Sequence, residues 1–450
     1  MLRVVGSALV VLALLGSAAA ATTLEEALAK VYETSPRLAA ARARLRAVDE
    51  DVPQALGTGR PRLTASSGAT ASRVETNRSG ANLSTFRQVL ALEQQLYSGG
   101  LTPALVSRAE NAVRAERARL AAVEQDVLLE TVAVYGAVLR DRAVLELARN
   151  NEKSLERQLA ATRDRFRFGE VTRTDVAQAE SRLARAIADR LAAEGDLAIA
   201  ASDYLRLVGE PPGALVPVAL PEPLPASLEE ALQAVETHPI VRAAWHTLDG
   251  ARDDTDAALA ALKPRLVLQG EAAYTNDPDT TYSWQSELSV GATLKVPLYQ
   301  GGGEYARVRQ SRQTVVQRRY DLDDARRAVG RDIAAAWQGL LTVRARLGSI
   351  ATQIRAAELA LDGVRTEALT GARTVLDILD AEQELFAARV ARTRAQREEV
   401  LAAHALLAAT GTLGVERLRV PTTPYDVEAH YRSVRGKWFG TGEADGARRP

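Results

Sequence analysis

The chain has 450 residues and a formal net charge of zero, because 57 lysines and arginines balance 57 aspartates and glutamates. Balanced, interspersed charge argues against a protein that binds nucleic acid or anionic membranes through a general basic surface. Aromatic residues make up only 4% of a chain that is 46% hydrophobic, so alanine, leucine and valine supply most of the apolar surface. This composition is typical of long, closely packed helices and not of compact globular domains.

Residues 1–21 read as a secretory signal peptide. They begin "MLRVVGSALVVLALLGSAAAA", with one arginine, a short apolar run and an Ala-x-Ala ending. We expect cleavage after Ala20 or Ala21 and export of the protein, since the apolar run is short for a membrane anchor. The sequence holds no cysteine, which excludes disulfides, thiolate metal ligands and a lipid-modified N-terminal cysteine.

The rest of the chain is one unit written twice. "TLEEAL" at 23–28 returns as "SLEEAL" at 227–232, and "GEVTRTDVAQAE" at 169–180 aligns with "GARTVLDILDAE" at 371–382. Ordered matches at a nearly constant offset indicate an internal repeat. We therefore divide the chain into a first repeat at 22–207, a proline-rich linker at 208–226, a second repeat at 227–420 and a flexible tail at 421–450.

Each repeat predicts the same elements in the same order. A short helix opens at a capping box, Thr23 to Glu26 or Ser227 to Glu230, and a second helix starts near Pro36 or Pro239 and runs to about residue 58 or 262. Two strands, a very long helix and a returning helix follow; the expected ranges are 61–73, 84–97, 102–168 and 173–208, then 264–275, 282–298, 303–369 and 374–411. Each long helix would span roughly 100 Å.

The first long helix carries a coiled-coil signal. Apolar residues recur at every seventh position along it: Val106, Val113, Leu120, Val127 and Val134. A seven-residue repeat is the mark of a helix seam, so most of the chain is predicted to be antiparallel coiled coil.

Residues 282–298 alternate between apolar and polar side chains, which predicts a half-buried strand. One reading is an ordinary sheet packed on the helices. The other is an outer-membrane barrel strand, with an apolar outside and a polar inside. The scarce aromatics favour the second reading, because they gather on or beside the strands as aromatic residues do at membrane interfaces; they are Phe86, Tyr97, Tyr274, Tyr282, Trp284 and Tyr299. Four strands cannot close a barrel, so several chains must share one. Two chains would give eight strands and a filled interior, three would give twelve and a lumen, and the polar inward faces favour three.

Both strand pairs end in a Leu-Tyr-x-Gly-Gly junction, "LYSGG" at 96–100 and "LYQGG" at 298–302. We expect these residues to form a strand-to-helix hinge, in which glycine allows a sharp bend; they are Tyr97, Gly99, Gly100, Tyr299, Gly301 and Gly302. A phosphate-binding loop would need a Gly-Lys-Ser/Thr ending, which neither junction has. No cofactor is therefore expected.

The twofold repeat, the two junctions and the two turns that contain "TDV" and "LDILDA" resemble the TolC family of outer-membrane efflux and secretion channels. The resemblance covers Leu24 to about Val420. It implies a mainly α protein in which a long coiled-coil α-barrel carries four strands per chain of a shared twelve-stranded transmembrane β-barrel. It also implies a non-enzymatic homotrimer in the outer membrane of a Gram-negative bacterium, with the helical tunnel in the periplasm.

Such a channel would give passive exit to substrates of a tripartite efflux pump or a type I secretion system. The implied partners are a periplasmic adaptor and an inner-membrane transporter of the resistance-nodulation-division or ABC type, besides outer-membrane lipid. A different class of function, a periplasmic coiled-coil adaptor or scaffold without a pore, stays open from the residues alone.

The resemblance also implies site residues. Asp377 and Asp380 would line the closed periplasmic entrance as a ring of carboxylates, and Arg373 would latch it by bonding to Thr174 and Asp175. Without the resemblance, the two aspartates read as solvated acids that complement a helix dipole. Ala368 departs from the better-known members of the family, which place a tyrosine in this network. The four histidines show no metal-ligand spacing and no catalytic arrangement stands out, so we expect neither a metal site nor an enzyme.

Overall fold

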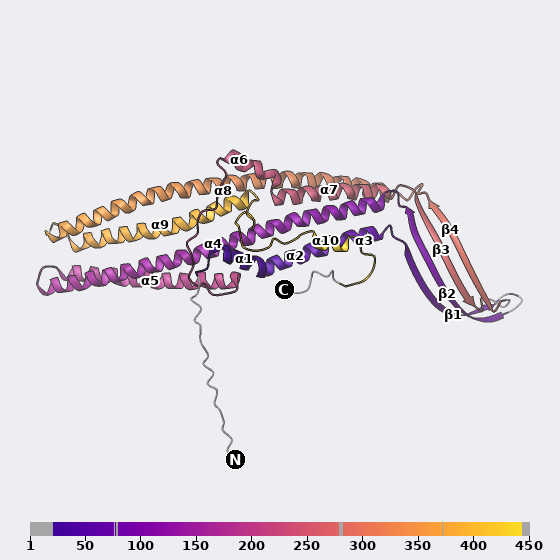
Figure 1. Cartoon of the computed structure of the whole chain (residues 1–450), viewed down its shortest axis with the longest axis horizontal. Helices are drawn as coiled ribbons and strands as arrows, with labels where there is room; N and C mark the ends of the chain where they lie inside the picture. The colour runs from indigo at the N-terminus through magenta and orange to yellow at the C-terminus, as the bar shows by residue number, and fades with distance from the viewer. Residues whose placement is uncertain (1–20, 76, 78–79, 279–281, 371, 443–450) are drawn as a thin grey trace, which may run out of the picture.

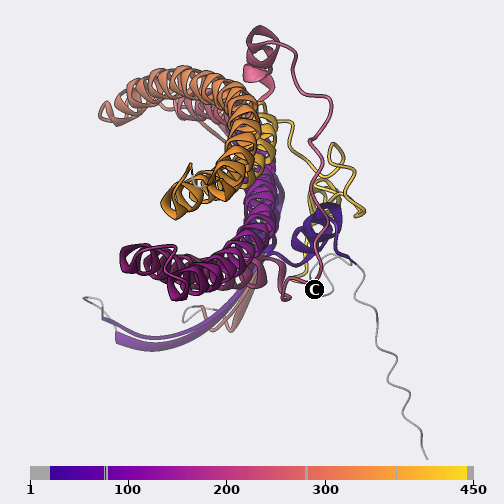
Figure 2. The same cartoon turned by 90° about the vertical axis from the view of Figure 1, so that its left-hand side faces the viewer.

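The computed structural model describes residues 21–75, 77, 80–278, 282–370 and 372–442. The predicted signal peptide, apart from Ala21, lies outside these residues. The described chain is a long, curved slab of helices that run side by side, with a sheet at one end (Figure 1). Seen along its length, the slab forms an arc, and the N-terminal helices, the linker and the C-terminal segment lie on its convex side (Figure 2).

The elements follow the predicted order. The first repeat holds α1 (Leu24–Thr34), α2 (Pro36–Asp49), α3 (Asp51–Gly57), β1 (Arg62–Glu75), β2 (Gly80–Tyr97), α4 (Leu101–Arg167) and α5 (Arg173–Val208). The second holds α6 (Leu228–Leu232), a 3₁₀ turn (Gln233–Thr237), α7 (Pro239–Ala260), β3 (Arg265–Asn276), β4 (Trp284–Lys295), α8 (Gly303–Leu369) and α9 (Val375–Ala409). A last short helix, α10, spans Ala429–Val434.

Several boundaries differ from the predicted ones; β2, for example, begins at Gly80 and not at 84. Proline explains two of the differences. The second helix was expected to run unbroken to about residue 58, but it ends at Asp49 and α3 begins at Asp51. Pro53 lacks a donor and its ring clashes with the carbonyl four residues earlier, which breaks the helix there. The last strand ends at Lys295 and not at 298, because Pro297 cannot donate to a strand ladder.

The predicted coiled coils are confirmed, and their seams combine large and small side chains. Val113, Leu120 and Val127 are buried along α4. The returning helix α5 contributes alanine at every seventh position of its buried side, at Ala179, Ala186, Ala193 and Ala200. Alanine lets two helices approach closely, which is why a chain poor in large apolar residues packs tightly.

The four strands form one antiparallel sheet in the order β1-β2-β3-β4. Leu63 lies opposite Leu92, which pairs with Gly270 and through it with Val290, so one row of one face is apolar apart from the glycine. On the other face Arg87 pairs with Glu271 at 2.9 Å. The sheet projects beyond the helices (Figure 1), and Leu288 and Val290 are 82% and 75% exposed. The alternative of an ordinary sheet packed on the helices is therefore wrong.

The C-terminal segment is more ordered than the predicted flexible tail. Within residues 421–442, His430 Nδ1 lies 2.9 Å from Asp49 Oδ2, the Arg117 guanidinium stacks 5.1 Å from the Tyr431 ring, and Val434 is buried. A hydrogen bond, a cation–π contact and a buried valine hold this segment against α2 and α4. None of the described helices is long and apolar enough to cross a bilayer.

Candidate functional site

The two strand-to-helix junctions have the backbone that their glycines predict. Gly99 and Gly100 have φ of +67° and +96°, and Gly301 and Gly302 have φ of +74° and +85°. These values lie in the left-handed region, where any other residue is strained. Beside them, Tyr97 and Tyr299 keep 51% and 79% of their side-chain surface exposed.

The two junctions differ in how tightly they are packed. A Cβ added to Gly99 would lie 2.8 Å from Lys263 Cβ and 2.9 Å from the Ala260 carbonyl oxygen, so the end of α7 presses directly on this glycine. The equivalent Gly301 has nothing within 4 Å of the same position. The junction at Gly99 is therefore packed against α7 of its own chain, whereas the junction at Gly301 has no such packing partner among the described residues.

At the opposite end of the slab, the two turns between long and returning helices are built alike. Thr172 and Thr374 are N-caps of α5 and α9, and each forms a capping box with the aspartate three residues on, Asp175 or Asp377. The Asp377 carboxylate accepts bonds from both the backbone N–H and the hydroxyl of Thr374. These bonds lower the pKa of Asp377 below its ordinary value, so the carboxyl is ionised at neutral pH.

Asp380, the second predicted ring residue, lies one helical turn beyond Asp377 and forms an ion pair with Arg182 of α5. The pair joins the two coiled coils near their tips. The structure therefore brings both aspartates to the same end of the molecule and gives each carboxylate a partner within the chain. Asp380 stays 55% exposed and is the more accessible of the two.

Arg373, the predicted latch, is bonded elsewhere in the single chain. Its Nε donates to Glu367 Oε2 at 2.8 Å, and this carboxylate raises the pKa of the guanidinium. Among the described residues Arg373 makes no bond to Thr174 or Asp175, and the Asp175 carboxylate is occupied by Thr172. As a contact within one chain, the predicted latch is not formed.

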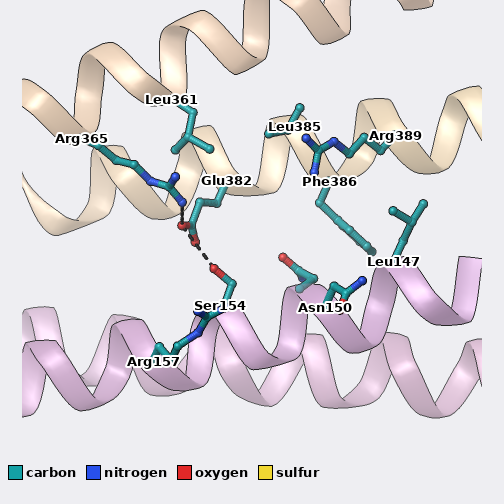
Figure 3. A pocket seen from close by; sticks show the side chains of 11 residues that line it. Leu147, Asn150, Ser154, Arg157, Leu361, Arg365, Glu382, Leu385, Phe386 and Arg389 are labelled. Carbon is teal, nitrogen blue, oxygen red and sulfur yellow. Dashed lines mark hydrogen bonds and ion pairs between the residues drawn. The ribbon is translucent and has the colours of Figure 1, made fainter.

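A contact that the sequence did not suggest lies between the two coiled coils (Figure 3). Glu382 of α9 accepts a bond from Arg365 of α8 at 2.7 Å, and the hydroxyl of Ser154 on α4 lies 3.5 Å from the same carboxylate. The Glu382 side chain is only 9% exposed, and its second oxygen has no hydrogen-bond partner. A cavity of about 320 Å³ adjoins it, lined also by Arg157 and Phe386. The only sequence signal was that Glu382 closes the repeated motif and aligns with Glu180.

The described residues hold no group of three or more histidines, aspartates or glutamates placed to bind a metal ion. His238 caps the start of α7, and His404 Nδ1 lies 2.7 Å from the Val400 carbonyl oxygen within α9. His430 pairs with Asp49 in the C-terminal segment. These three histidines have structural partners.

The comparisons with known proteins agree with the repeat. The family model of outer membrane efflux proteins matches residues 27–210 and again 231–412. The outer membrane efflux protein BepC of Brucella suis is 35% identical over 439 residues, which cover 96% of this chain and 95% of the relative. The outer membrane protein TolC of Vibrio cholerae is 27% identical and covers 89% and 93%.

Among solved structures, the outer membrane channel CmeC of Campylobacter jejuni superposes with a TM-score of 0.78 at 14% identity, covering 92% of this chain and 89% of that one. The chain belongs to the outer membrane efflux protein family, and its fold is that of the family's channels. The family is one of transport proteins, and it places the chain in the outer membrane.

Proposed function

We propose that three copies of this chain form a channel-tunnel that gives periplasmic substrates a passive exit through the outer membrane. The observation that carries the proposal is the four-stranded sheet. It projects from the helices, its edge strands β1 and β4 have no partner strand within the described chain, and one face exposes leucine and valine. Unpaired edges cannot face lipid, so neighbouring copies must supply the missing partners.

Three copies would supply twelve strands, enough to leave a lumen lined by the polar face that carries Arg87 and Glu271. The arc of helices in Figure 2 would then be one third of a tube that continues the barrel. Since the sheet lies in the membrane, a tube roughly 100 Å long extends from it into the periplasm. A pore-less adaptor, the alternative, would leave the apolar face of the sheet uncovered.

The proposed partners are those that the family resemblance implies. A passive tube has no energy source of its own, so an inner-membrane transporter of the resistance-nodulation-division or ABC type supplies it, through a periplasmic adaptor. The cargo of this channel belongs to the efflux or the type I secretion class.

The test is electrical. Purified trimer in a planar bilayer should conduct ions, and the mass in detergent should be that of three chains. A folded trimer that does not conduct ions would favour the pore-less adaptor. So would a chain that is recovered in the soluble fraction and not in the membrane fraction.

We also propose that Asp377 and Asp380 of three copies form a ring of carboxylates at the periplasmic entrance. What supports the ring is their shared place at the tip and the low pKa of Asp377. Asp377→Ala with Asp380→Ala should weaken cation selectivity and block by multivalent cations. Asp164→Ala is the control, because it removes an exposed acid near the first tip that belongs to neither the ring nor the latch; equal effects of both variants would refute the ring.

Arg373 remains a proposed latch, now with Glu367 as its partner inside the chain. When copies meet, the Arg373 guanidinium would also bond to Thr174 or Asp175 of a neighbouring copy, and this bond between copies would be the latch. Arg373→Ala should raise the single-channel conductance by loosening the entrance. If Glu367→Ala raises conductance and Arg373→Ala leaves it unaltered, the arginine is not the latch.

A further inference from the structure

The C-terminal segment carries two exposed aromatic residues that the channel function does not use. Trp438 is 62% exposed and Phe439 is 89% exposed, in a chain with few aromatics. Two neighbouring aromatic rings expose apolar surface to water, and such surface often marks an interaction site. Their position on the fold indicates what they would contact.

That position is fixed by contacts at the base of the segment. His430 pairs with Asp49 of α2, Arg435 donates to Glu110 of α4 at 2.9 Å, and Val434 is buried. Beyond this base, the chain continues beside α3 toward the end that carries the strands (Figure 1). The segment cannot move freely, because two hydrogen bonds and a buried side chain hold α10.

The tip of the segment meets the chain where helix gives way to strand. Arg60 donates to the Lys437 carbonyl oxygen at 2.6 Å, and its guanidinium stacks 4.7 Å from the Trp438 ring. Arg60 lies two residues before β1, and the neighbouring Gly59 carbonyl accepts a bond from Gln94 of β2 at 2.7 Å. Trp438 therefore lies at the level where the sheet begins.

The tip is also shaped to present its rings. Gly440 has φ of +99°, and the Lys437 ammonium donates to the Gly442 carbonyl oxygen at 2.5 Å, which closes a tight turn around the two aromatics. Figure 2 places this C-terminal segment on the convex side of the arc, away from the concave side that would enclose the lumen.

We propose that Trp438 and Phe439 form a membrane-surface anchor that inserts into the periplasmic leaflet of the outer membrane, and that its ligand is phospholipid. This inference rests on the proposed function, because it takes the sheet to span that membrane. Tryptophan favours the boundary between acyl chains and head groups. Arg60 and Lys437 place positive charge beside the rings, within reach of lipid phosphates.

The anchor would act together with the barrel. The strands hold the channel within the bilayer, whereas the anchor fixes the height and tilt of the tube from outside, through α2 and α4. It is a contact with the membrane made by a segment that lies outside both repeats.

The experiment uses trimer reconstituted in vesicles of phosphatidylethanolamine and phosphatidylglycerol. One variant keeps only Trp438 (Trp245→Phe, Trp284→Phe, Trp337→Phe), and a matched variant keeps only Trp284 of β4. Lipids carrying a spin label near the head group, and acrylamide in the water, quench the fluorescence from either side. We expect labelled lipid to quench both tryptophans and acrylamide to reach Trp438 poorly.

Each result decides between the two proposals. If labelled lipid quenches Trp284 and not Trp438, the anchor is wrong and the channel stands. The anchor is equally wrong if Trp438 is shielded from both quenchers, which would mean that protein covers it. If lipid quenches neither residue, the sheet is not in the bilayer and both proposals fail.

A second measurement avoids the multiple substitutions. Trp438→Ala with Phe439→Ala, made in the otherwise unchanged chain, should remove part of the lipid-quenchable emission. Trp245→Phe serves as its control, since this residue lies on α7 about 22 Å along the helix from the strand end, and it should leave that part unchanged. The reverse pattern would overturn the anchor.

Discussion

Equivalent ion pairs occur near the tips of the two coiled coils, at the same end of the molecule, in two different surroundings. In the first repeat Arg163 bonds to Glu180 at 2.6 Å, and both side chains are about half exposed. In the second repeat the equivalent Arg365 bonds to Glu382 at 2.7 Å, and the glutamate is only 9% exposed. The residues are identical and the bond lengths nearly so, so the difference comes from what covers the glutamate.

The cover of Glu382 is α4, whose Ser154 approaches its carboxylate. In the repeat, α4 corresponds to α8. A ring of three copies would place α8 of one copy against α5 of the next, as α4 lies against α9 within each chain. Glu180 is then exposed in the single chain because its cover belongs to a neighbouring copy. If copies assemble as proposed, one chain contains an example of the contact between copies, namely α4 against α9.

The largest effect is expected at the free side of α8. Leu359 is 75% exposed and occupies the position of Arg157 in the first repeat. It lies on the side of α8 opposite the buried Ile354 and Leu361, where a neighbouring copy would pack. Leu359→Asp should lower the trimer population at least about tenfold, because each copy loses a buried leucine and gains an acid where the first repeat has an arginine.

Light scattering in detergent measures this change. Ala360→Asp is the matched control, since Ala360 is exposed and adjacent but points about a quarter turn away. Equal loss of trimer in both variants would break the proposed correspondence between α4 and α8.

The alanine seams should respond alike in both repeats. Ala186 of α5 and the equivalent Ala388 of α9 are 2% and 1% exposed. Replacing either with leucine should cost about 1–3 kcal/mol through overpacking, measured as a lower midpoint of thermal unfolding. Ala184→Leu, at an exposed position of α5, should change the midpoint little. Unequal effects at Ala186 and Ala388 would show that the seams are not equivalent.

The repeated ion pair offers a sharper and smaller test. Glu382→Ala should destabilise the trimer by about 1 kcal/mol, because it removes a charge-assisted bond at a contact between coiled coils. Glu180→Ala should have less effect than this in the isolated, detergent-dispersed monomer, where the pair is exposed. In the trimer the two variants should converge, and urea unfolding of both species would measure this. A Glu180 effect that does not grow on assembly would contradict the ring.

The smallest expected effect is the pH dependence of cation block at Asp377. A carboxyl whose pKa lies below its ordinary value of 3.8 keeps its charge as pH falls toward that value, and protonates only below it. The other carboxylates of the ring oppose this lowering, because like charges disfavour the ionised form. Block of the channel by a multivalent cation should therefore persist at neutral pH and fade as the pH falls toward this value. Current recordings across a pH series would check this; block already lost near neutral pH would exclude Asp377 as the blocking site.

Much of the fold could be read from the sequence, because its signals are local and repeated. Seven-residue periodicity, alternation and paired glycines each reflect a rule that acts over a few residues, and the internal repeat doubled every signal. The same holds for the capping box of Asp377, which needs only a threonine three residues earlier. Even the break after Asp49 follows from Pro53 and could have been predicted.

The contacts between coiled coils could not be read in this way. Arg182 and Asp380 are 198 residues apart, and no pattern within either helix indicates which arginine will face which acid. In the sequence, Glu382 is one of several charged residues near the start of a helix, and nothing there indicates that α4 buries it. The segment 421–442 was misjudged for the same reason, since its partners Asp49, Glu110 and Arg117 lie more than 300 residues earlier.

The unequal packing of the two junctions bears on how the channel is put together. Within one chain the end of α7 locks Gly99, whereas Gly301 stays free. In a closed ring the element equivalent to α7 is the α3 segment of the next copy, so the second lock would close only when copies meet. A single subunit would then begin assembly with the orientation of β1 and β2 fixed relative to its helices. The orientation of β3 and β4 would still be free to change. Closure of the last seam would fix all three loose strand pairs together, which makes insertion of the finished barrel a cooperative final step.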